Sequence, residues 1–427
     1  MQRSFLVNGH RIFRPAALAG ALAAALAALA APAAAQDFPV EAPVPPPARQ
    51  ALAGDEAAGE SGEPAHVPPP LVTPLHILDR HVLPGTRMVL TWNGSQGYAG
   101  NDMAAPVIVV HGAQAGPTLC LTAGVHGDEI NGVEIVRRVM NTLAPEQVSG
   151  TVIGVPVVNL FGYQRGSRYL PDRRDLNRFF PGTRYGSVAS RIAHSFFENV
   201  VRHCDALVDF HTGSFDRSNL PQVRADLRIP EVLEFTRGFG ATVVLHSKGN
   251  PGMLRVAATA VGIPAVTFEV GAPARLQPEE IETAVAAIAR LMHKMGLVES
   301  ESIEQEPQPI FYESRWIRAD HGGLLISDVE LGQRVRRGQR LGRVIDPLGN
   351  TERDIVSPIF GRVLGMAQNQ QVLPGFAVYH LGEETSEEKA VEEAAAGHAE
   401  PPVEEDGEHG APEAAGERTR DPEDDFE

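Results

Sequence analysis

Short hydrophobic runs rich in β-branched residues recur through the middle of the chain. Five of them lie at residues 117–123, 151–159, 205–210, 241–245 and 263–269. Runs of this length and composition are typical of strands that are buried on both faces of a sheet. Segments with hydrophobic residues three and four positions apart predict helices over residues 133–140, 188–203 and 278–295. This alternation predicts one α/β domain over residues 72–298, long enough to bury a large core.

A different pattern begins after residue 298. Residues 299–310 form an acidic, proline-bearing linker, and residues 311–382 contain short apolar runs separated by glycine turns. This second segment is predicted to be a small all-β domain. Within it, Val335–Leu341 and Ile355–Val363 resemble a biotinyl/lipoyl-type half-barrel, a family that carries a modified lysine between these two segments. No lysine occurs in residues 311–382, so the resemblance implies the shape of that domain without its carrier chemistry.

The first residues have the pattern of a secretory signal peptide. Three arginines precede an Ala/Leu-rich run over residues 16–31, and the small residues Ala33 and Ala35 provide a cleavage site. An uncleaved membrane anchor is the alternative, but the run is shorter and less apolar than the roughly 20 residues that a membrane span prefers. We therefore predict a signal peptide over residues 1–35. The mature protein is expected to be exported, periplasmic or secreted, without a membrane span.

Two further segments are biased in composition. Residues 36–71 are a leader rich in Pro and Ala, and residues 383–427 are a tail with 18 acidic residues against three basic ones. Both are expected to be disordered. The formal net charge of −17 therefore belongs mainly to the tail and says little about the folded part. No basic stripe is present, which argues against nucleic-acid binding.

The chain has only two cysteines, Cys120 and Cys204. They are too few for a disulfide scaffold, and they lack the spacing of metal ligands. Both lie in or just before apolar runs, so we expect buried free thiols, because buried cysteine behaves as a small hydrophobic residue. Export would make a disulfide possible, since oxidising compartments preserve such bonds.

The turn from Gly124 to Glu129 follows a hydrophobic strand and precedes a helix. Open α/β sheets bind ligands at the carboxyl ends of their strands, so His126 and Glu129 lie where a cation could bind. His211 ends a second hydrophobic strand in the same way. Each of these residues alone is commonly a surface, packing or capping residue. Together, two imidazoles and one carboxylate form the His2Glu set of a catalytic zinc site, with one zinc per chain.

Two carboxylates accompany this set. Asp209, two residues before His211, is a candidate to fix the orientation of that imidazole ring. Glu269 ends a third hydrophobic strand, where burial of a carboxylate is costly without a purpose. A general base beside a metal-activated water is such a purpose, and an exposed strand-end glutamate is the alternative.

Arginines are frequent in residues 168–182. Their planar guanidinium groups suit the bidentate capture of a carboxylate. Asn177 and Arg178 are candidates to hold a substrate carboxylate, while another arginine polarises the carbonyl of the scissile bond. A structural loop with solvated arginines is the alternative.

Four motifs occur in order along the chain: Gly-x-His-Gly-Asp-Glu, Asp-Leu-Asn-Arg-x-Phe-Pro-Gly, Asp-x-His-Thr-Gly and Phe-Glu-x-Gly. They resemble those of the succinylglutamate desuccinylase/aspartoacylase family, which is related to the zinc metallocarboxypeptidases. The resemblance covers about residues 72–382 and implies an α/β/α mixed-sheet domain followed by an all-β domain. The site residues it implies are the zinc ligands His126, Glu129 and His211, the base Glu269, the substrate-carboxylate ligands Asn177 and Arg178, the oxyanion-stabilising Arg168, and Arg255 in a substrate-contacting loop.

These residues predict a zinc-dependent hydrolase of amide C–N bonds that acts on a small molecule with a free carboxylate, as an N-acyl amino acid deacylase does. Export favours one alternative, a periplasmic zinc carboxypeptidase that trims peptide C-termini or cell-wall peptides. A non-catalytic zinc- or ligand-binding module is the alternative from another class, although a buried base has no use there. An esterase is less favoured, because no Gly-x-Ser-x-Gly elbow is present. The sequence leaves the oligomeric state open.

Overall fold

The computed structural model describes residues 72–94, 104–299 and 308–384. The predicted signal peptide and leader lie outside the described residues, as do most of the predicted linker and nearly all of the predicted acidic tail. Among the helices of the described residues, none is both long and apolar enough to cross a membrane.

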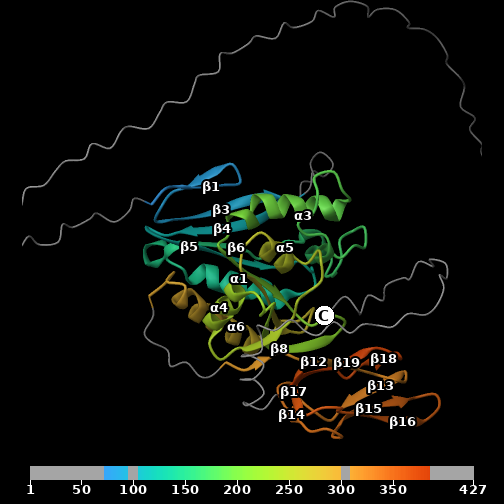
Figure 1. Cartoon of the computed structure of the whole chain (residues 1–427). Coiled ribbons are helices and arrows are strands. Elements are labelled where there is room, and N and C mark those ends of the chain that lie inside the picture. Colours follow the sequence, from blue (N-terminus) through green and yellow to red (C-terminus); the bar gives the residue numbers. More distant parts are fainter. Residues whose placement is uncertain (1–71, 95–103, 300–307, 385–427) are drawn as a thin grey trace, which may run out of the picture. The chain divides into compact units, whose positions relative to one another are not determined.

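A large mixed sheet forms the centre of the α/β part (Figure 1). Its strands follow the order β3-β4-β6-β5-β7-β10-β8-β9. The inner strands β6, β5, β7 and β10 are parallel to one another, whereas β4 and β8 join this group antiparallel on either side. The strand bounds are β1 Leu75–Ile77, β2 Arg80–Val82, β3 Thr86–Asn93, β4 Ala104–His111, β5 Gln114–Ala123, β6 Ser149–Val155, β7 Ala206–His211, β8 Arg217–Ala225, β9 Val243–His246 and β10 Ala265–Gly271.

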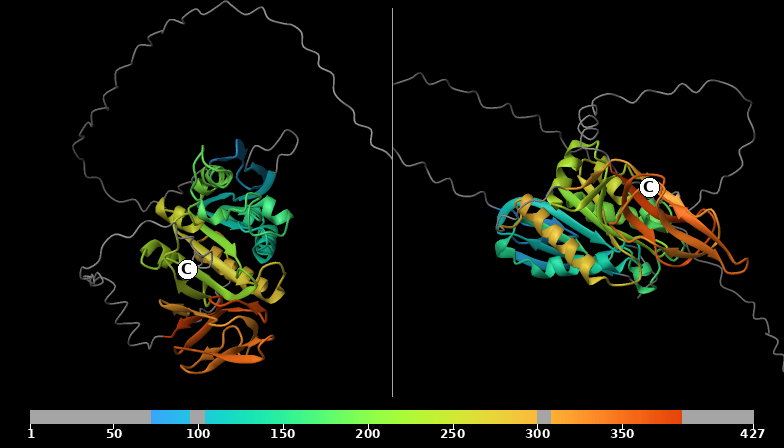
Figure 2. Two further views of the ribbon diagram at one scale, coloured as in Figure 1. Left: turned by 90° about the vertical axis from the view of Figure 1, so that its right-hand side faces the viewer. Right: turned by 90° about the horizontal axis from the view of Figure 1, so that it is seen from below.

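Helices cover both faces of this sheet (Figures 1 and 2). One hydrophobic core packs α1, α4 and α6 against the sheet, and a second core packs α3, α5 and the β1–β2 hairpin against its other face. The helix bounds are α1 Ile130–Thr142, α2 Leu160–Gln164, α3 Val188–Asn199, α4 Pro230–Thr236, α5 Leu254–Ala260 and α6 Pro278–Lys294, with short 3-10 turns η1 Pro145–Gln147, η2 Leu176–Arg178, η3 Val201–His203 and η4 Arg237–Phe239. The predicted α/β/α mixed-sheet architecture is confirmed.

The register of three neighbouring strands decides where the polar strand ends meet. Ala123 at the end of β5 lies opposite Phe210 of β7, and His211 of β7 lies opposite Glu269 of β10. Since these strands are parallel, their carboxyl ends lie at one edge of the sheet. The turn after β5, the end of β7 and the end of β10 therefore face a common space.

The C-terminal part is all-β, as predicted. Strands β16-β15-β13-β18 form a four-stranded sheet, while β12, β19 and β17 join the large sheet through pairing of β17 with β8. The strand bounds are β11 Ile310–Phe311, β12 Ser314–Arg318, β13 Gly323–Ser327, β14 Arg334–Val335, β15 Arg340–Asp346, β16 Thr351–Val356, β17 Gly361–Ala367, β18 Gln371–Val372 and β19 Ala377–Glu383. The biotinyl/lipoyl-like character of this part stays a prediction. Its strand β17 lies directly beside β8, which borders β10.

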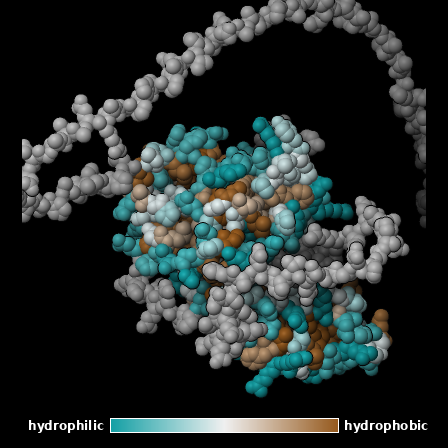
Figure 3. Space-filling view, viewed as in Figure 1, coloured by the Kyte–Doolittle hydropathy of each residue, from teal (hydrophilic) through white to brown (hydrophobic). Residues whose placement is uncertain are grey.

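Hydrophobic side chains reach the surface of both parts. Figure 3 shows them as separate areas among hydrophilic residues, over the α/β part and over the C-terminal strands. The most exposed large ones are Tyr185 and Leu348. Scattered exposure of this kind is normal for a folded protein, because apolar atoms contribute much of any protein surface.

The two cysteines form a disulfide, so the expectation of buried free thiols was wrong. Cys120 lies in β5, and Cys204 comes just before β7, with 5.7 Å between the two Cα atoms. Because β5 and β7 are adjacent, with Leu119 opposite Ala206, the two thiols lie side by side. The sequence separation of 84 residues gives no sign of this proximity.

Candidate active site

The turn after β5 positions His126 with the help of two glycines. Gly124 has a φ of +61°, a left-handed conformation that favours glycine. A Cβ on Gly127 would lie 2.0 Å from the backbone carbon of Gly162, so only glycine lets the turn pack against α2. The backbone N–H of Asn159 donates to the carbonyl of Gly124 at 2.8 Å. These contacts explain why glycine occupies both positions beside the histidine.

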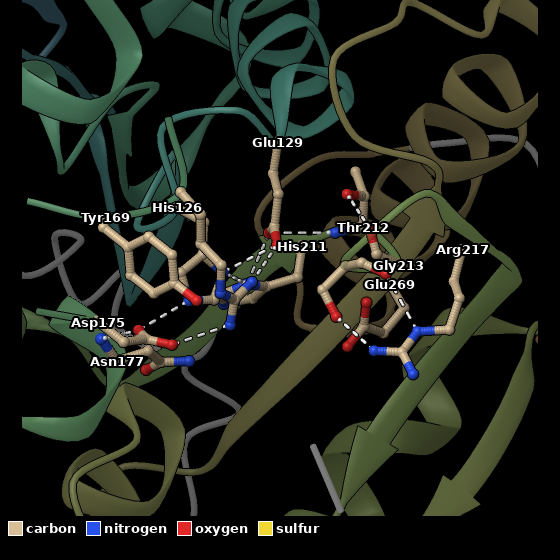
Figure 4. A network of polar contacts seen from close by, with 12 residues as sticks. His126, Glu129, Tyr169, Asp175, Asn177, His211, Thr212, Gly213, Arg217 and Glu269 are labelled. Atoms are coloured by element: carbon tan, nitrogen blue, oxygen red, sulfur yellow. Dashed lines mark hydrogen bonds and ion pairs between the residues drawn. The ribbon is translucent and has the colours of Figure 1, made fainter. Parts of the chain in front are cut away.

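His126, Glu129 and His211 converge, as predicted, and all three are buried (Figure 4). His126 Nδ1 lies 2.9 Å from Glu129 Oε1, and His211 Nδ1 lies 2.9 Å from Glu129 Oε2. The two Nδ1 atoms are 3.1 Å apart. Ligand atoms around a tetrahedral zinc are roughly 3.3 Å apart at ordinary bond lengths. The three side chains could therefore close on one ion with little movement.

The outer nitrogens of both rings contact carboxylates. His211 Nε2 lies 2.8 Å from Asp209 Oδ2, which is the contact predicted for Asp209. His126 Nε2 lies 3.0 Å from Asp175 Oδ1. Metal-bound histidines usually donate the N–H of their other ring nitrogen to such a group. Here that nitrogen is Nε2, so the lone pair of Nδ1 is available to the ion. The donor set and its surroundings thus fit a zinc site.

The charges around Glu129 favour its ionised form. Burial alone would raise its pKa, but His126 and His211 outweigh this effect, and the pKa of the Glu129 carboxyl is lowered. Arg168 Nη1 donates to Glu129 Oε1 at 3.0 Å, and its Nη2 donates to Asp175 Oδ2 at 2.9 Å. Metal binding requires a deprotonated carboxylate, which this environment provides.

Glu269 is buried near the end of β10, two residues before Gly271, with 8% of its surface exposed. The exposed-glutamate alternative therefore does not hold. Asn219 Nδ2 donates to Glu269 Oε2 at 3.0 Å, and Arg224 Nε lies 3.7 Å from Oε1. Both partners come from β8. They hold the carboxylate in a pocket that the three metal-ligand candidates also line.

The four remaining predicted residues line the same pocket, which has an empty volume of about 600 Å³, open solvent included. Arg168 contacts Glu129, as described above. Asn177 Oδ1 accepts the backbone N–H of Leu254 at 2.8 Å, and Arg178 Nη1 donates to the carbonyl of Asn177 at 3.0 Å. The structure therefore brings all eight predicted site residues together.

Arg255 is buried in the first turn of α5, rather than in a loop. It donates to the carbonyl oxygen and to the hydroxyl of Ser247, each at 3.0 Å. Burial, with Arg224 nearby, lowers the pKa of Arg255 to about 10. The guanidinium therefore stays charged at neutral pH.

Several residues that line the pocket or contact its lining residues were not identified from the sequence; Asp175, which contacts His126 and Arg168, is of the second kind. Asp175 is the first residue of the Asp-Leu-Asn-Arg motif, and this motif was the sequence signal by which it could have been found. Arg217 of β8 and Trp316 of β12 also line the pocket, and the Arg217 guanidinium carbon lies 5.1 Å from the Trp316 ring centroid. Trp316 comes from the C-terminal part, and no local motif connects it to the site.

Comparison with known proteins agrees with this fold. The chain has the mixed α/β sheet of solved succinylglutamate desuccinylase/aspartoacylase structures. The succinylglutamate desuccinylase/aspartoacylase catalytic domain model matches residues 115–295. N-alpha-acetyl-L-2,4-diaminobutyric acid deacetylase from Halomonas elongata is 32% identical over 254 residues, which cover 56% of this chain and 74% of the relative. The chain belongs to the succinylglutamate desuccinylase/aspartoacylase family, whose members include deacylating amide hydrolases.

Solved structures of the same family share the fold. A succinylglutamate desuccinylase/aspartoacylase from Rhodobacter sphaeroides is 25% identical, with a TM-score of 0.62, covering 70% of this chain and 96% of that one. The product-bound ectoine utilization protein EutE (DoeB) from Ruegeria pomeroyi is 24% identical, with a TM-score of 0.64, covering 71% of this chain and 98% of that one. Both relatives are matched over nearly their whole length.

Proposed function

We propose that the chain is a zinc-dependent amide hydrolase that removes the acyl group from a small N-acylated amino acid with a free carboxylate. The observation that carries this proposal is the convergence of His126, Glu129 and His211 in the pocket that Glu269 lines. Zinc held by these three residues would polarise the substrate carbonyl and lower the pKa of a water molecule. The name of the Halomonas relative, a deacetylase of an N-acetylated amino acid, supports this substrate class.

Glu269 is the general base in this proposal. It accepts the proton of the attacking water and then passes it to the amine nitrogen as the C–N bond breaks. Asn219 fixes the orientation of the carboxylate through its hydrogen bond to Oε2. Arg168, beside Glu129, stabilises the negative charge that develops on the carbonyl oxygen.

Asn177 and Arg178 bind the carboxylate of the amino acid half, and Arg255 adds positive charge to the same pocket. Since Leu254 N–H occupies the oxygen of the Asn177 side chain, its amide group is oriented with Nδ2 as a donor. Arg178 supplies the paired N–H donors that suit a carboxylate.

Arg178→Ala is expected to raise KM for the best N-acyl amino acid roughly tenfold to hundredfold, with a smaller effect on kcat. The reason is that the substrate carboxylate is bound equally in the ground and transition states, and one charged hydrogen bond has about this strength. Arg174→Ala is the matched control, because Arg174 belongs to the same segment but pairs with Asp172. Equal use by the wild type of a substrate and of its carboxamide analogue would remove Arg178 from recognition.

We also propose that the protein is exported and is cleaved after Ala35. The disulfide between Cys120 and Cys204 supports export, because such bonds persist in oxidising compartments. Mass spectrometry of the protein from its native host is expected to find Gln36 at the N-terminus. Intact chains that begin at Met1, recovered in the membrane fraction, would contradict the proposal.

A substrate screen tests the proposed function. The zinc-loaded protein from Gln36 to Glu427 is offered N-acetyl amino acids, dipeptides and peptidoglycan fragments under the same conditions. We expect the N-acetyl amino acids to be hydrolysed fastest. Preferred cleavage of peptides would establish the carboxypeptidase alternative, and zinc binding without any hydrolysis would indicate a non-catalytic zinc-binding module.

A further inference from the structure

A second cavity adjoins the active-site pocket. Its empty volume is about 1110 Å³, open solvent included, and it shares Arg224, Ser247 and Trp316 with the pocket. Its walls come from the ends of β8 and β9, from the segment that follows β9, and from the C-terminal part, where β12, the residues just before it and β19 contribute. The shared residues make the second cavity a continuation of the first.

The orientation of the substrate in the active-site pocket decides whether its amine half or its acyl half could reach the second cavity. Figure 4 places Asn177 on one side of the metal-ligand candidates, and Glu269 and Arg217 on the other side. In the proposed function, Asn177 binds the carboxylate of the amine half, so the acyl half extends toward Arg217. Arg217 stacks on Trp316, which lines both cavities. A long acyl chain would therefore pass Trp316 and enter the second cavity.

Two buried polar atoms on residues of this cavity have no hydrogen-bond partner among the described residues. One is Nδ1 of His380, a residue with only 3% of its surface exposed, and the other is Nδ2 of Asn250. Buried polar atoms without partners are rare in folded proteins, because losing water without a replacement is costly. A ligand that enters the cavity would bring the missing partners.

The ring of His380 is held firmly and can act as a donor. It stacks on Trp316 with 4.2 Å between ring centroids, and its Nε2 lies 2.9 Å from the hydroxyl of Ser314. Burial, together with Arg224 and Arg217, lowers the pKa of His380, so the ring is neutral. When the Ser314 hydroxyl donates to Nε2, the ring proton lies on Nδ1.

The polar groups of the cavity favour an anion. The Asn250 amide nitrogen is a donor, and the ammonium group of Lys248 also lines the cavity. Arg224 reaches the cavity as well, although its charge is shared with Glu269, whose Oε1 lies 3.7 Å from Arg224 Nε, and Glu313 is the one carboxylate among the lining residues. We propose that the second cavity binds the distal end of a long acyl group that terminates in a carboxylate. The inference rests on the proposed function, and it specifies the acyl half of the substrate.

Three forms of one amino acid test the proposal, chosen as the amino acid whose N-acetyl form is hydrolysed fastest. The N-pimeloyl and N-heptanoyl forms have acyl chains of equal length, and only the pimeloyl group ends in a carboxylate. The wild-type protein, loaded with zinc, is expected to show a kcat/KM for the pimeloyl form at least about tenfold above that for the heptanoyl form. A ratio near one would overturn the proposal.

Two variants test whether the named residues provide this preference. Lys248→Met and Asn250→Leu are each expected to lower the pimeloyl-to-heptanoyl ratio about tenfold. The ratio does not change when a variant merely loses folded protein or zinc, so a purely structural effect would leave it intact. Lys294→Met, at an exposed lysine near the end of α6 that lines neither cavity, is the matched control. A ratio that both variants preserve would overturn the assignment of the cavity.

The N-acetyl form separates this inference from the proposed function. Hydrolysis of the N-acetyl form without a preference for the pimeloyl form would overturn the inference alone. Failure of the zinc-loaded protein to hydrolyse any of the three forms would overturn the proposed function, and the inference with it.

Discussion

Glu269→Gln is expected to lower kcat by roughly 10²–10⁴ while the variant keeps one zinc per chain. The substitution preserves the size of the side chain and its packing at the end of β10, but an amide cannot accept the proton of the attacking water. In the wild type, Asn219 Nδ2 donates to Glu269 Oε2 at 3.0 Å. The side-chain oxygen of glutamine can accept the same hydrogen bond. The loss should therefore appear in the chemical step rather than in folding or substrate binding.

Glu146→Gln is a suitable control for this measurement, because Glu146 is exposed in η1 and lies outside the pocket. It should leave kcat unchanged. Steady-state kinetics and metal analysis of the same samples separate loss of the base from loss of zinc. Normal turnover by Glu269→Gln would mean that the base is another residue.

His211→Ala is expected to remove both the zinc and the hydrolytic activity. The substitution deletes one of two imidazole ligands and leaves only His126 and Glu129, which are too few for a catalytic zinc site. Metal analysis after gel filtration measures the loss, and circular dichroism shows whether the fold persists. A His211→Ala protein with stoichiometric zinc would exclude this residue from the metal site.

Asp209→Asn provides a graded version of the same test. Asp209 Oδ2 contacts His211 Nε2 at 2.8 Å, while its Oδ1 accepts the hydroxyl of Thr122 at 2.7 Å. Loss of such an outer contact typically lowers metal affinity about 10–100-fold without removing a ligand. Zinc affinity should therefore fall in the order wild type, Asp209→Asn, His211→Ala.

Much of the site could be predicted because its residues end hydrophobic strands. His211 and Glu269 each follow an apolar run, and the turn that holds His126 carries the glycines that its backbone needs. The runs identify the strands, and parallel pairing brings their carboxyl ends to one edge. Local sequence thus contained the position of each candidate ligand, although not the distances between them.

Strand β8 shows why other parts of the site could not be predicted. Its sequence from Arg217 to Ala225 is largely polar, yet most of its residues are buried. The polar side chains of β8 find hydrogen-bond partners within the site and in the C-terminal part. For example, Gln222 donates to the carbonyl of Leu364. Hydrophobic patterning cannot detect such a strand. Asn219 and Arg224, which hold Glu269, were missed for this reason.

Contacts between residues far apart in the sequence account for the remaining differences between the predicted and the observed structure. The Cys120–Cys204 disulfide depends on the adjacency of β5 and β7, and Trp316 enters the pocket through the pairing of β8 with β17 and of β12 with β19. Both follow from strand order in the sheet. Strand order is a property of the whole fold, and no motif near these residues specifies it.

In the proposed function, zinc on His126, Glu129 and His211 makes the chain an amide hydrolase. The most direct measurement adds zinc stepwise to metal-free protein and follows hydrolysis of the best N-acyl amino acid. The rate should rise from a negligible value and level off at one zinc per chain, whereas His211→Ala should show no such rise. Full hydrolysis by the metal-free protein in the presence of a chelator would show that the activity does not depend on zinc.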